Sequence, residues 1–501
     1  MNLGGEGESD LLRAGARARE HGDLATALRL FEQAAREESG DLRLCALVDI
    51  ACVTDESGDH ARAVELFHAA LAQIPPDAPR LRPAALLNLS QALQRLGDLD
   101  AAQHVLDQAR TLLTADTAPG ELRFACLVSA TALALHRHQW PRAIELANES
   151  LTAARRFAPE QAGHPLMNLA AAHFETGRWE LAEDFATQAL AAFEAVDDRD
   201  GIAESRQNLA LMRTRTGRFD EAEPLLRAAQ EFFETAGIAH RAGIGWKLTG
   251  FITEHRGDTD GAAQHYRRAL HRFEESGALL DAADVRLRLA TLACAAHQYA
   301  DAATEFAAAR ATYAARGLGM HCAQLDYWHA ALLEPLVQAR PDYLPQVLDL
   351  AVPAALALDA VRYELPDGAQ RHAWNSRIAD PALRVAFRYA YLAQDARLLA
   401  DLIETRCAGT IPEITTMTTT PFPATLDLLE PFDPPTPSGP TSDALQLGSA
   451  LAAVAASAGL PVSPPPRVAV APDAHIALAD WITAAEQRYG RRLRDDRVVQ
   501  A

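Results

Sequence analysis

The stretch Gly257–Ala269 reads GDTDGAAQHYRRA, and its pattern predicts the fold of much of the chain. After the Gly-Asp pair, Ala262, Tyr266 and Ala269 fall at helical spacing and form one apolar stripe. Glycine can adopt the left-handed conformation that ends a helix, and the aspartate can cap the helix that follows. The segment therefore predicts a tight turn between two helices, the second of which buries an apolar face.

The same pattern recurs along the chain at a nearly constant interval. Its turn residues stand at positions 22, 58, 97, 138, 177, 217, 257 and 297, so the intervals are 36, 39, 41, 39, 40, 40 and 40 residues. In two degenerate copies, His138 and His297 replace the glycine. A fixed period of this size is typical of a solenoid, in which each unit buries its stripe against its neighbours. We therefore expect an all-α, right-handed helical-repeat solenoid of about eight helix pairs, with the alanine and aromatic positions in its core.

These repeats resemble the tetratricopeptide repeat superfamily in both helices of the unit. Trp246 and Gly250 match the first helix of the consensus, and Ala262, Tyr266 and Ala269 match the second. The period of about 40 residues exceeds the usual 34, which implies longer helices. The resemblance covers about residues 8–318, and it implies a protein or peptide ligand in a concave groove lined by the first helix of each pair.

Charge and composition restrict the partners and the compartment. The net charge of −20 over 501 residues disfavours nucleic acids and anionic membranes, since both attract a positive surface. The six cysteines show no CxxC spacing and suit small core residues in a reducing cytoplasm. We find neither a signal peptide nor 18 uninterrupted apolar residues, so we expect a cytoplasmic protein. The only lysine, Lys247, stands beside 46 arginines, which indicates a GC-rich bacterial genome.

The chain lacks the local patterns that mark common catalytic sites. No phosphate-binding loop, dinucleotide-binding GxGxxG, GxSxG or HExxH is present. His321 and Cys322 are adjacent in a helical stretch, so they cannot serve together as a peptidase dyad. His136 and His138 flank a turn and are expected to be ordinary surface residues. We therefore predict no enzyme activity, no cofactor and no metal.

Changes in composition predict four segments. Prolines interrupt the helical pattern after the repeats and predict short or kinked helices there, and a run of Thr and Pro then predicts a linker that cannot fold. Near the end, Val468-Ala469-Val470 predicts a strand, Ala477–Tyr489 a helix, and Leu493–Val499 an extended tail. The predicted segments are a solenoid at 1–318, a helical extension at 319–410, a linker at 411–446 and a small C-terminal module at 447–501.

The C-terminal part has a resemblance of its own. It is similar to actinobacterial repeat proteins that accompany caspase-like peptidases of the CHAT type, and this similarity implies such a peptidase as a partner. The turn Pro472-Asp473-Ala474 departs from the usual Pro-Asp-Gly of that ending. The residues that carry the resemblance are Arg371-His372-Ala373-Trp374, Ala386-Phe387-Arg388, Leu402-Ile403-Glu404, Pro466-Arg467-Val468, Ala477-Leu478-Ala479 and Arg488-Tyr489-Gly490.

One polar pattern stands out from the predicted core. The chain has only six asparagines, and Asn88, Asn168 and Asn208 each stand nine residues before a turn glycine. A side-chain amide donates and accepts hydrogen bonds at once, so a row of asparagines on the first helices can hold an extended peptide backbone. Proteins of the resembled superfamily use such a row on bound peptides. The alternative is that each asparagine bonds to a neighbouring helix and ties the repeats together.

Other residues are candidates for the same surface. The equivalent positions in three other repeats hold Ser129, Leu248 and Arg288, and charged neighbours could bind a ligand carboxylate. The neighbouring candidates are Arg95, Glu175, Arg215, Lys247 and His255. We therefore expect a non-catalytic scaffold or sensor in a bacterial signalling or defence system. The alternative is a peptide-responsive regulator of a separate DNA-binding or enzymatic partner.

Overall fold

The computed structural model describes most of the chain, and it divides into two compact units. The described residues are 9–20, 23–57, 59–114, 119–137, 139–363, 374–407, 467–470 and 475–500. The first unit ends at Gly277, and the second begins at Ala278. The division falls between the seventh and eighth helix pairs.

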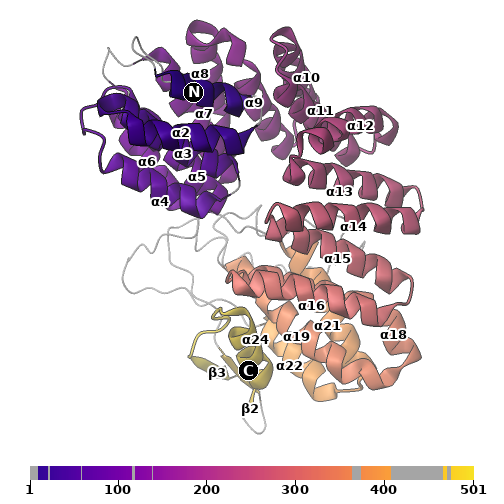
Figure 1. Ribbon diagram of the computed structural model, residues 1–501. Helices are drawn as coiled ribbons and strands as arrows, with labels where there is room; N and C mark the ends of the chain where they lie inside the picture. Colours follow the sequence, from indigo (N-terminus) through magenta and orange to yellow (C-terminus); the bar gives the residue numbers. More distant parts are fainter. Residues whose placement is uncertain are drawn as a thin grey trace. The chain divides into compact units, whose positions relative to one another are not determined.

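The first unit is built from seven pairs of helices that follow one another along the chain (Figure 1). The first helix of each pair is odd-numbered and the second is even-numbered. Their bounds are α1 (Asp10–Glu20), α2 (Leu24–Glu37), α3 (Gly40–Glu56), α4 (His60–Leu71), α5 (Leu81–Leu96), α6 (Leu99–Leu112), α7 (Gly120–His136), α8 (Trp140–Phe157), α9 (Gly163–Glu175), α10 (Trp179–Ala195), α11 (Arg199–Arg215), α12 (Phe219–Ala236), α13 (Ala239–His255) and α14 (Thr259–Glu275).

The turns inside the pairs have the predicted chemistry. Gly97 and Gly257 are left-handed, with φ of +79° and +83°, a conformation that costs little only for glycine. The aspartates that follow, Asp98 and Asp258, accept hydrogen bonds from backbone N–H groups in the first turn of α6 and α14. The first turn of a helix leaves N–H groups without a partner, so these carboxylates fix where each second helix begins.

The apolar stripe is buried as the spacing predicted. Ala262, Tyr266 and Ala269 are at most 1% exposed. The ring of Tyr266 lies against Gly250 of α13, where an added Cβ would stand 2.7 Å from Cε1 of the ring. The absence of a side chain at Gly250 therefore lets α13 and α14 pack closely. In the fifth pair the buried position belongs to Ala186, and the aromatic residue expected there, Phe185, is only partly buried.

The second unit begins with the eighth pair and continues into the extension. Its helices are α15 (Leu279–Ala295), α16 (Tyr299–Ala315), α17 (Gly319–Leu332), α18 (Glu334–Ala339), α19 (Leu344–Ala360), α21 (Asp380–Leu392), α22 (Ala396–Cys407) and α24 (Ala479–Tyr489). Its strands are β1 (Arg467–Val470), β2 (His475–Ile476) and β3 (Val498–Gln500), in the order β2-β1-β3. Strand β1 pairs antiparallel to β2 and parallel to β3.

Prolines shape the extension less than the sequence suggested. Pro335, Pro345 and Pro381 stand in the first turns of α18, α19 and α21, where a missing N–H has no consequence. Helix α19 runs for 17 residues with Pro353 inside it, so it is not short, which was one of the two alternatives that the prolines predicted. The stretch Pro341–Tyr363 is long and apolar enough to cross a bilayer, and 72% of its most apolar window is buried within the unit.

The C-terminal segment packs into the core of the second unit. The predicted strand and helix are confirmed as β1 and α24. Ile482 and Tyr489 of α24 are buried in one cluster with α17 and α19. The carboxylate of Asp401 in α22 accepts hydrogen bonds from Leu478 N, at 3.0 Å, and bonds to His475 Nε2 at 2.7 Å. The predicted linker at 411–446 lies outside the described residues.

The eighth pair replaces the turn glycine with a residue that must adopt a strained conformation. His297 has φ of +60°, in the left-handed region that costs a residue with a Cβ about 1 kcal/mol or more. We expect His297→Gly to raise the free energy of unfolding by about 1 kcal/mol, measured by denaturant unfolding of the full chain. His297→Ala keeps the strained φ and is the control, so an equal gain from alanine would contradict this explanation.

Candidate peptide-binding surface

The first helices of successive pairs contact one another in the first unit and form a continuous surface. Helix α5 contacts α3 and α7, α9 contacts α7 and α11, and α11 contacts α13. The position nine residues before each turn residue recurs on these helices. Its occupants are Asp49, Asn88, Ser129, Asn168, Asn208 and Leu248, which we call the helix-face row.

Asn88 is engaged in a contact between repeats. Its side chain is half-buried, and Nδ2 donates to Sγ of Cys52 in α3 over 3.2 Å. Burial raises the pKa of Cys52 to about 12, so this sulfur is a neutral thiol. The sequence left open whether each asparagine holds a peptide or bonds to a neighbouring repeat. At Asn88 the geometry supports the bond to a neighbouring repeat.

Asn168 and Asn208 differ from Asn88. Both are half-buried, and neither side chain makes a hydrogen bond to another residue in the described part of the chain. Their neighbours make the contacts between repeats instead. Ser205 donates to the sulfur of Met167 over 3.4 Å, and Gln207 donates to the carbonyl of Arg241 over 2.8 Å. The two asparagine amides are thus left available for a ligand.

The other predicted row positions do not extend this surface. Ser129 is 1% exposed and lies 3.3 Å from Nε2 of Gln94 in α5, so it joins repeats and presents no open polar group. Leu248 is 6% exposed and belongs to the apolar core between α11 and α13. Arg288 is half-buried on α15 of the second unit.

Most of the predicted charged neighbours are exposed, and some of them already have partners within the protein. Arg95 pairs with the buried carboxylate of Asp55 in α3, which is also 2.7 Å from Nδ1 of His60. Arg215 and Glu175 are exposed at the ends of α11 and α9, and Lys247 is half-buried. His255 lies against Phe219 and Phe251, with ring centroids 5.4 and 4.1 Å apart. These residues flank the helix-face row, but the structure does not bring them together around one point.

Asp49 is a row residue that the sequence analysis missed. It stands nine residues before Gly58, the same spacing that singled out the asparagines, so the repeat register could have identified it. Burial raises the pKa of its carboxyl to about 6, against an opposing effect of Arg19. The guanidinium of Arg19 is bonded to Glu56, with Nε 2.9 and 3.0 Å from the two carboxylate oxygens. The carboxyl of Asp49 is therefore a weaker acid than an ordinary aspartate, and it belongs to the helix-face row.

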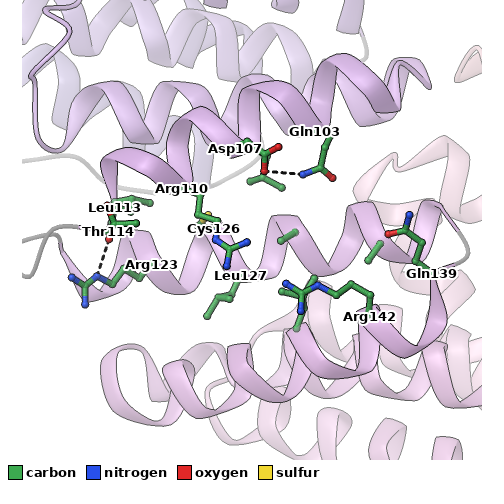
Figure 2. Close-up of a pocket in the computed structure, with 14 residues that line it drawn as sticks. Gln103, Asp107, Arg110, Leu113, Thr114, Arg123, Cys126, Leu127, Gln139 and Arg142 are labelled. Carbon is green, nitrogen blue, oxygen red and sulfur yellow. Dashed lines mark hydrogen bonds between the residues drawn. The ribbon is translucent and has the colours of Figure 1, made fainter. Parts of the chain in front are cut away.

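Second helices and the first helices that follow them form two pockets in the described part of the first unit. One has a volume of about 300 Å³ and lies among α6, α7 and α8 (Figure 2). The other, of about 340 Å³, lies between α12 and α13, where Nε1 of Trp246 donates to Glu234 over 2.6 Å. None of the row asparagines lines either pocket.

The described residues contain no group of three or more His, Cys, Asp or Glu side chains arranged to hold a metal ion. Of the two histidines near the fourth turn, His136 is exposed, and His138 lies outside the described residues. The described cysteines carry free thiols, and Cys52, Cys126, Cys294 and Cys322 are buried.

A chain of helix pairs with left-handed turns and stripes of Ala and aromatic residues defines a helical-repeat protein. The sequence matches the family models described as tetratricopeptide repeat over residues 56–117 and 162–235. The chain therefore contains tetratricopeptide repeats in these two stretches, and the resemblance read from its residues is confirmed there. No curated protein matches the sequence.

Several solved structures are similar to the chain at low identity. A Rap protein complexed with competence and sporulation factor is 14% identical, with a TM-score of 0.47, over 72% of this chain and 99% of that one. The apo quorum sensor NprR from B. thuringiensis is 15% identical, with a TM-score of 0.43, over 72% and 97%. A STAND protein with a tetratricopeptide repeat sensor from Pyrococcus horikoshii is 16% identical, with a TM-score of 0.44, over 60% and 47%. The likeness concerns the fold.

Proposed function

We propose that the first unit binds an extended peptide, with Asn168 and Asn208 holding the peptide backbone. The observation that carries this proposal is that both amides are half-buried on adjacent first helices and lack a partner among the described residues. A primary amide offers both a donor and an acceptor, which is what a peptide group requires of its neighbour. Two such amides on α9 and α11 recognise backbone and leave sequence selectivity to the surrounding side chains.

Asn88 and Ser129 have a different role in this proposal. Both join neighbouring repeats and stabilise the surface on which the two free amides lie. Asp49 would add a titratable group at one end of the row. The ligand-binding part of the row is therefore shorter than the sequence suggested, and it is centred on α9 and α11.

A peptide-binding repeat protein of this kind acts as a non-catalytic scaffold or sensor in the cytoplasm of a bacterium. The resemblance of the C-terminal segment adds a CHAT-type, caspase-like peptidase as the candidate partner. Co-purification of the full chain with the product of a neighbouring peptidase gene tests whether such a peptidase is the partner. The second candidate, a peptide-responsive regulator, requires the same peptide site and differs only in the protein that it controls.

The decisive variant is Asn168→Ala/Asn208→Ala. Peptides are first selected on the full chain from a random dodecapeptide library, and their affinities are then measured by fluorescence polarisation. Each lost hydrogen bond is worth about 0.5–1.5 kcal/mol, so we expect the double variant to bind about fivefold to a hundredfold more weakly. The melting temperature should stay nearly unchanged, because neither amide has a partner to lose within the described protein.

Two control variants distinguish a loss of peptide contacts from a general loss of stability. Asn148→Ala removes an asparagine on α8 whose amide donates to its own helix at Ile144, and it should leave affinity unchanged. Asn88→Ala removes the bond to Cys52 and should lower stability more than affinity. A double variant that melts at a lower temperature and binds peptide as the wild type does would refute the role of Asn168 and Asn208.

A further inference from the structure

One repeat position lies where each second helix packs against the first helix of the next pair. Its side chain determines whether the space between these two helices is filled. The position stands thirteen residues after each turn residue. Five repeats carry an apolar residue there, and Leu71 and Leu151 are buried in the core. The apolar occupants are Ala35, Leu71, Leu151, Leu190 and Leu270, and the exceptions are Arg110, Gln230 and Arg310.

Two of the three polar exceptions find partners inside the protein. Arg310 in the second unit bonds through Nε to the buried carboxylate of Asp326, at 3.0 and 3.2 Å. Gln230 donates to Glu234 at 2.9 Å and to the carbonyl of Ala242 at 3.2 Å. The repeats thus compensate a polar group at this position with a matching polar group nearby.

Arg110 has no such partner within the described residues, and it is exposed to solvent. Its guanidinium makes no hydrogen bond or ion pair to another described residue. The position on α7 that corresponds to Trp246 in α13 is occupied by Leu127, which offers no polar atom. Where other repeats insert a leucine, α6 therefore presents a cation above an apolar floor, and a pocket of about 300 Å³ remains open.

Three of the charged residues around this pocket are arginines, and one of them, Arg142, also pairs with Glu145 over 3.0 Å. Figure 2 shows Arg110 and Arg142 reaching into the pocket from α6 and α8, with Arg123 at one end. The one acidic lining residue, Asp107, already accepts a hydrogen bond from Gln103 over 3.0 Å. Burial raises the pKa of the Cys126 thiol in the pocket wall to about 11, so it carries no compensating charge at neutral pH. On a chain with a net charge of −20, this is a local concentration of positive charge.

The floor of the pocket is apolar, and the volume of about 300 Å³ has room for a side chain. It is formed by Leu106, Leu113, Leu127, Ala130 and Leu146. An aliphatic group placed there gains the free energy of leaving water, and a carboxylate beside it would meet two guanidinium groups. The pocket therefore matches a ligand that carries both features within a few ångströms of each other.

We propose that the pocket among α6, α7 and α8 binds an acidic protein segment that inserts an aliphatic side chain and places an adjacent Asp or Glu carboxylate between Arg110 and Arg142. This site uses other residues than the asparagine amides, so it does not rest on the proposed peptide site. It gives the first unit a second contact for a protein partner, selective for negative charge.

The repeat pattern supplies the test variant. Arg110→Leu installs the residue that four other repeats carry at this position, so it removes the charge, fills the pocket and leaves the fold intact. The probe is a fluorescein-labelled peptide with capped ends and the sequence Leu-Asp-Leu-Leu-Glu, measured by fluorescence polarisation on the full chain. Because the hydrogen bonds that are lost are charge-assisted, we expect Arg110→Leu to bind the probe at least tenfold more weakly than the wild type. We expect Arg142→Gln to bind it about tenfold more weakly.

Matched controls make the result specific. Arg155→Gln removes an exposed arginine from α8 outside the pocket and should leave probe affinity unchanged. The neutral probe Leu-Asn-Leu-Leu-Gln should bind at least tenfold more weakly than the acidic one, and added salt should narrow that difference. Asn168→Ala/Asn208→Ala should bind the acidic probe as the wild type does. Equal affinity for the two probes, no measurable binding of the acidic probe, or wild-type affinity in Arg110→Leu would each overturn the proposal.

Discussion

Replacing Asp326 with alanine is expected to lower the free energy of unfolding of the second unit by about 3–5 kcal/mol. The carboxylate is 1% exposed on α17. It accepts hydrogen bonds from Nε of Arg310, at 3.0 Å, and from the hydroxyl of Tyr489, at 2.8 Å. Alanine would leave a guanidinium and a buried hydroxyl without their acceptor and would loosen α16 and α24 from α17. The hydroxyl of Tyr489 would stay buried, and the guanidinium of Arg310, which is 33% exposed, would regain only part of its hydration, so removing the carboxylate costs more than its hydrogen bonds contribute.

The full chain should be used for this measurement because α24 belongs to the same core. Denaturant unfolding followed by circular dichroism reports the total change, and hydrogen exchange in α17 and α24 locates it. Asp349→Ala is the control, since it removes an exposed carboxylate that pairs with Arg488 at 2.8 Å, and it should cost less than about 1 kcal/mol. Similar losses in both variants would mean that the burial of Asp326 does not matter.

Replacing Asp49 with asparagine is expected to remove a pH dependence from the stability of the first unit. The pKa of Asp49 is raised from 3.8 to about 6 in the folded protein, chiefly by burial. Between these values the folded state binds more protons than the unfolded state, so wild-type stability falls as pH rises from about 4 to about 6. Asparagine does not ionise. The variant should therefore be more stable than the wild type above pH 6, by up to about 3 kcal/mol for a shift of two pH units.

Thermal unfolding of both proteins at pH 4, 5, 6 and 7, with hydrogen exchange in α3, measures this effect. The difference between variant and wild type should grow through this range and then level off. Since asparagine is the residue found at the same position of three other repeats, the substitution also makes the helix-face row more uniform. A constant difference at all four pH values would show that the carboxyl of Asp49 is not the titrating group.

The sequence by itself determined the repeat architecture because the signals for it are local. A turn residue such as Gly257 and a capping Asp258 set helix ends through their own backbone and side-chain geometry. Stripes such as Ala262, Tyr266 and Ala269 follow from helical periodicity, and a period near 40 residues requires that each unit bury its stripe against the next. The strand at Val468–Val470 and the helix that ends at Tyr489 were also predictable from local pattern.

Only the tertiary structure decided which polar residues are free. Asn88, Asn168 and Asn208 are equivalent in sequence, yet Asn88 bonds to Cys52 whereas Met167 and Gln207 make the inter-repeat contacts beside the other two. Arg110 and Arg310 share a repeat position, and the second has Asp326 as its partner while the first lines a pocket. Each outcome depends on a residue of the adjoining repeat brought within hydrogen-bond distance by packing. Local periodicity fixes the face on which a side chain lies, but not the atom that it meets there.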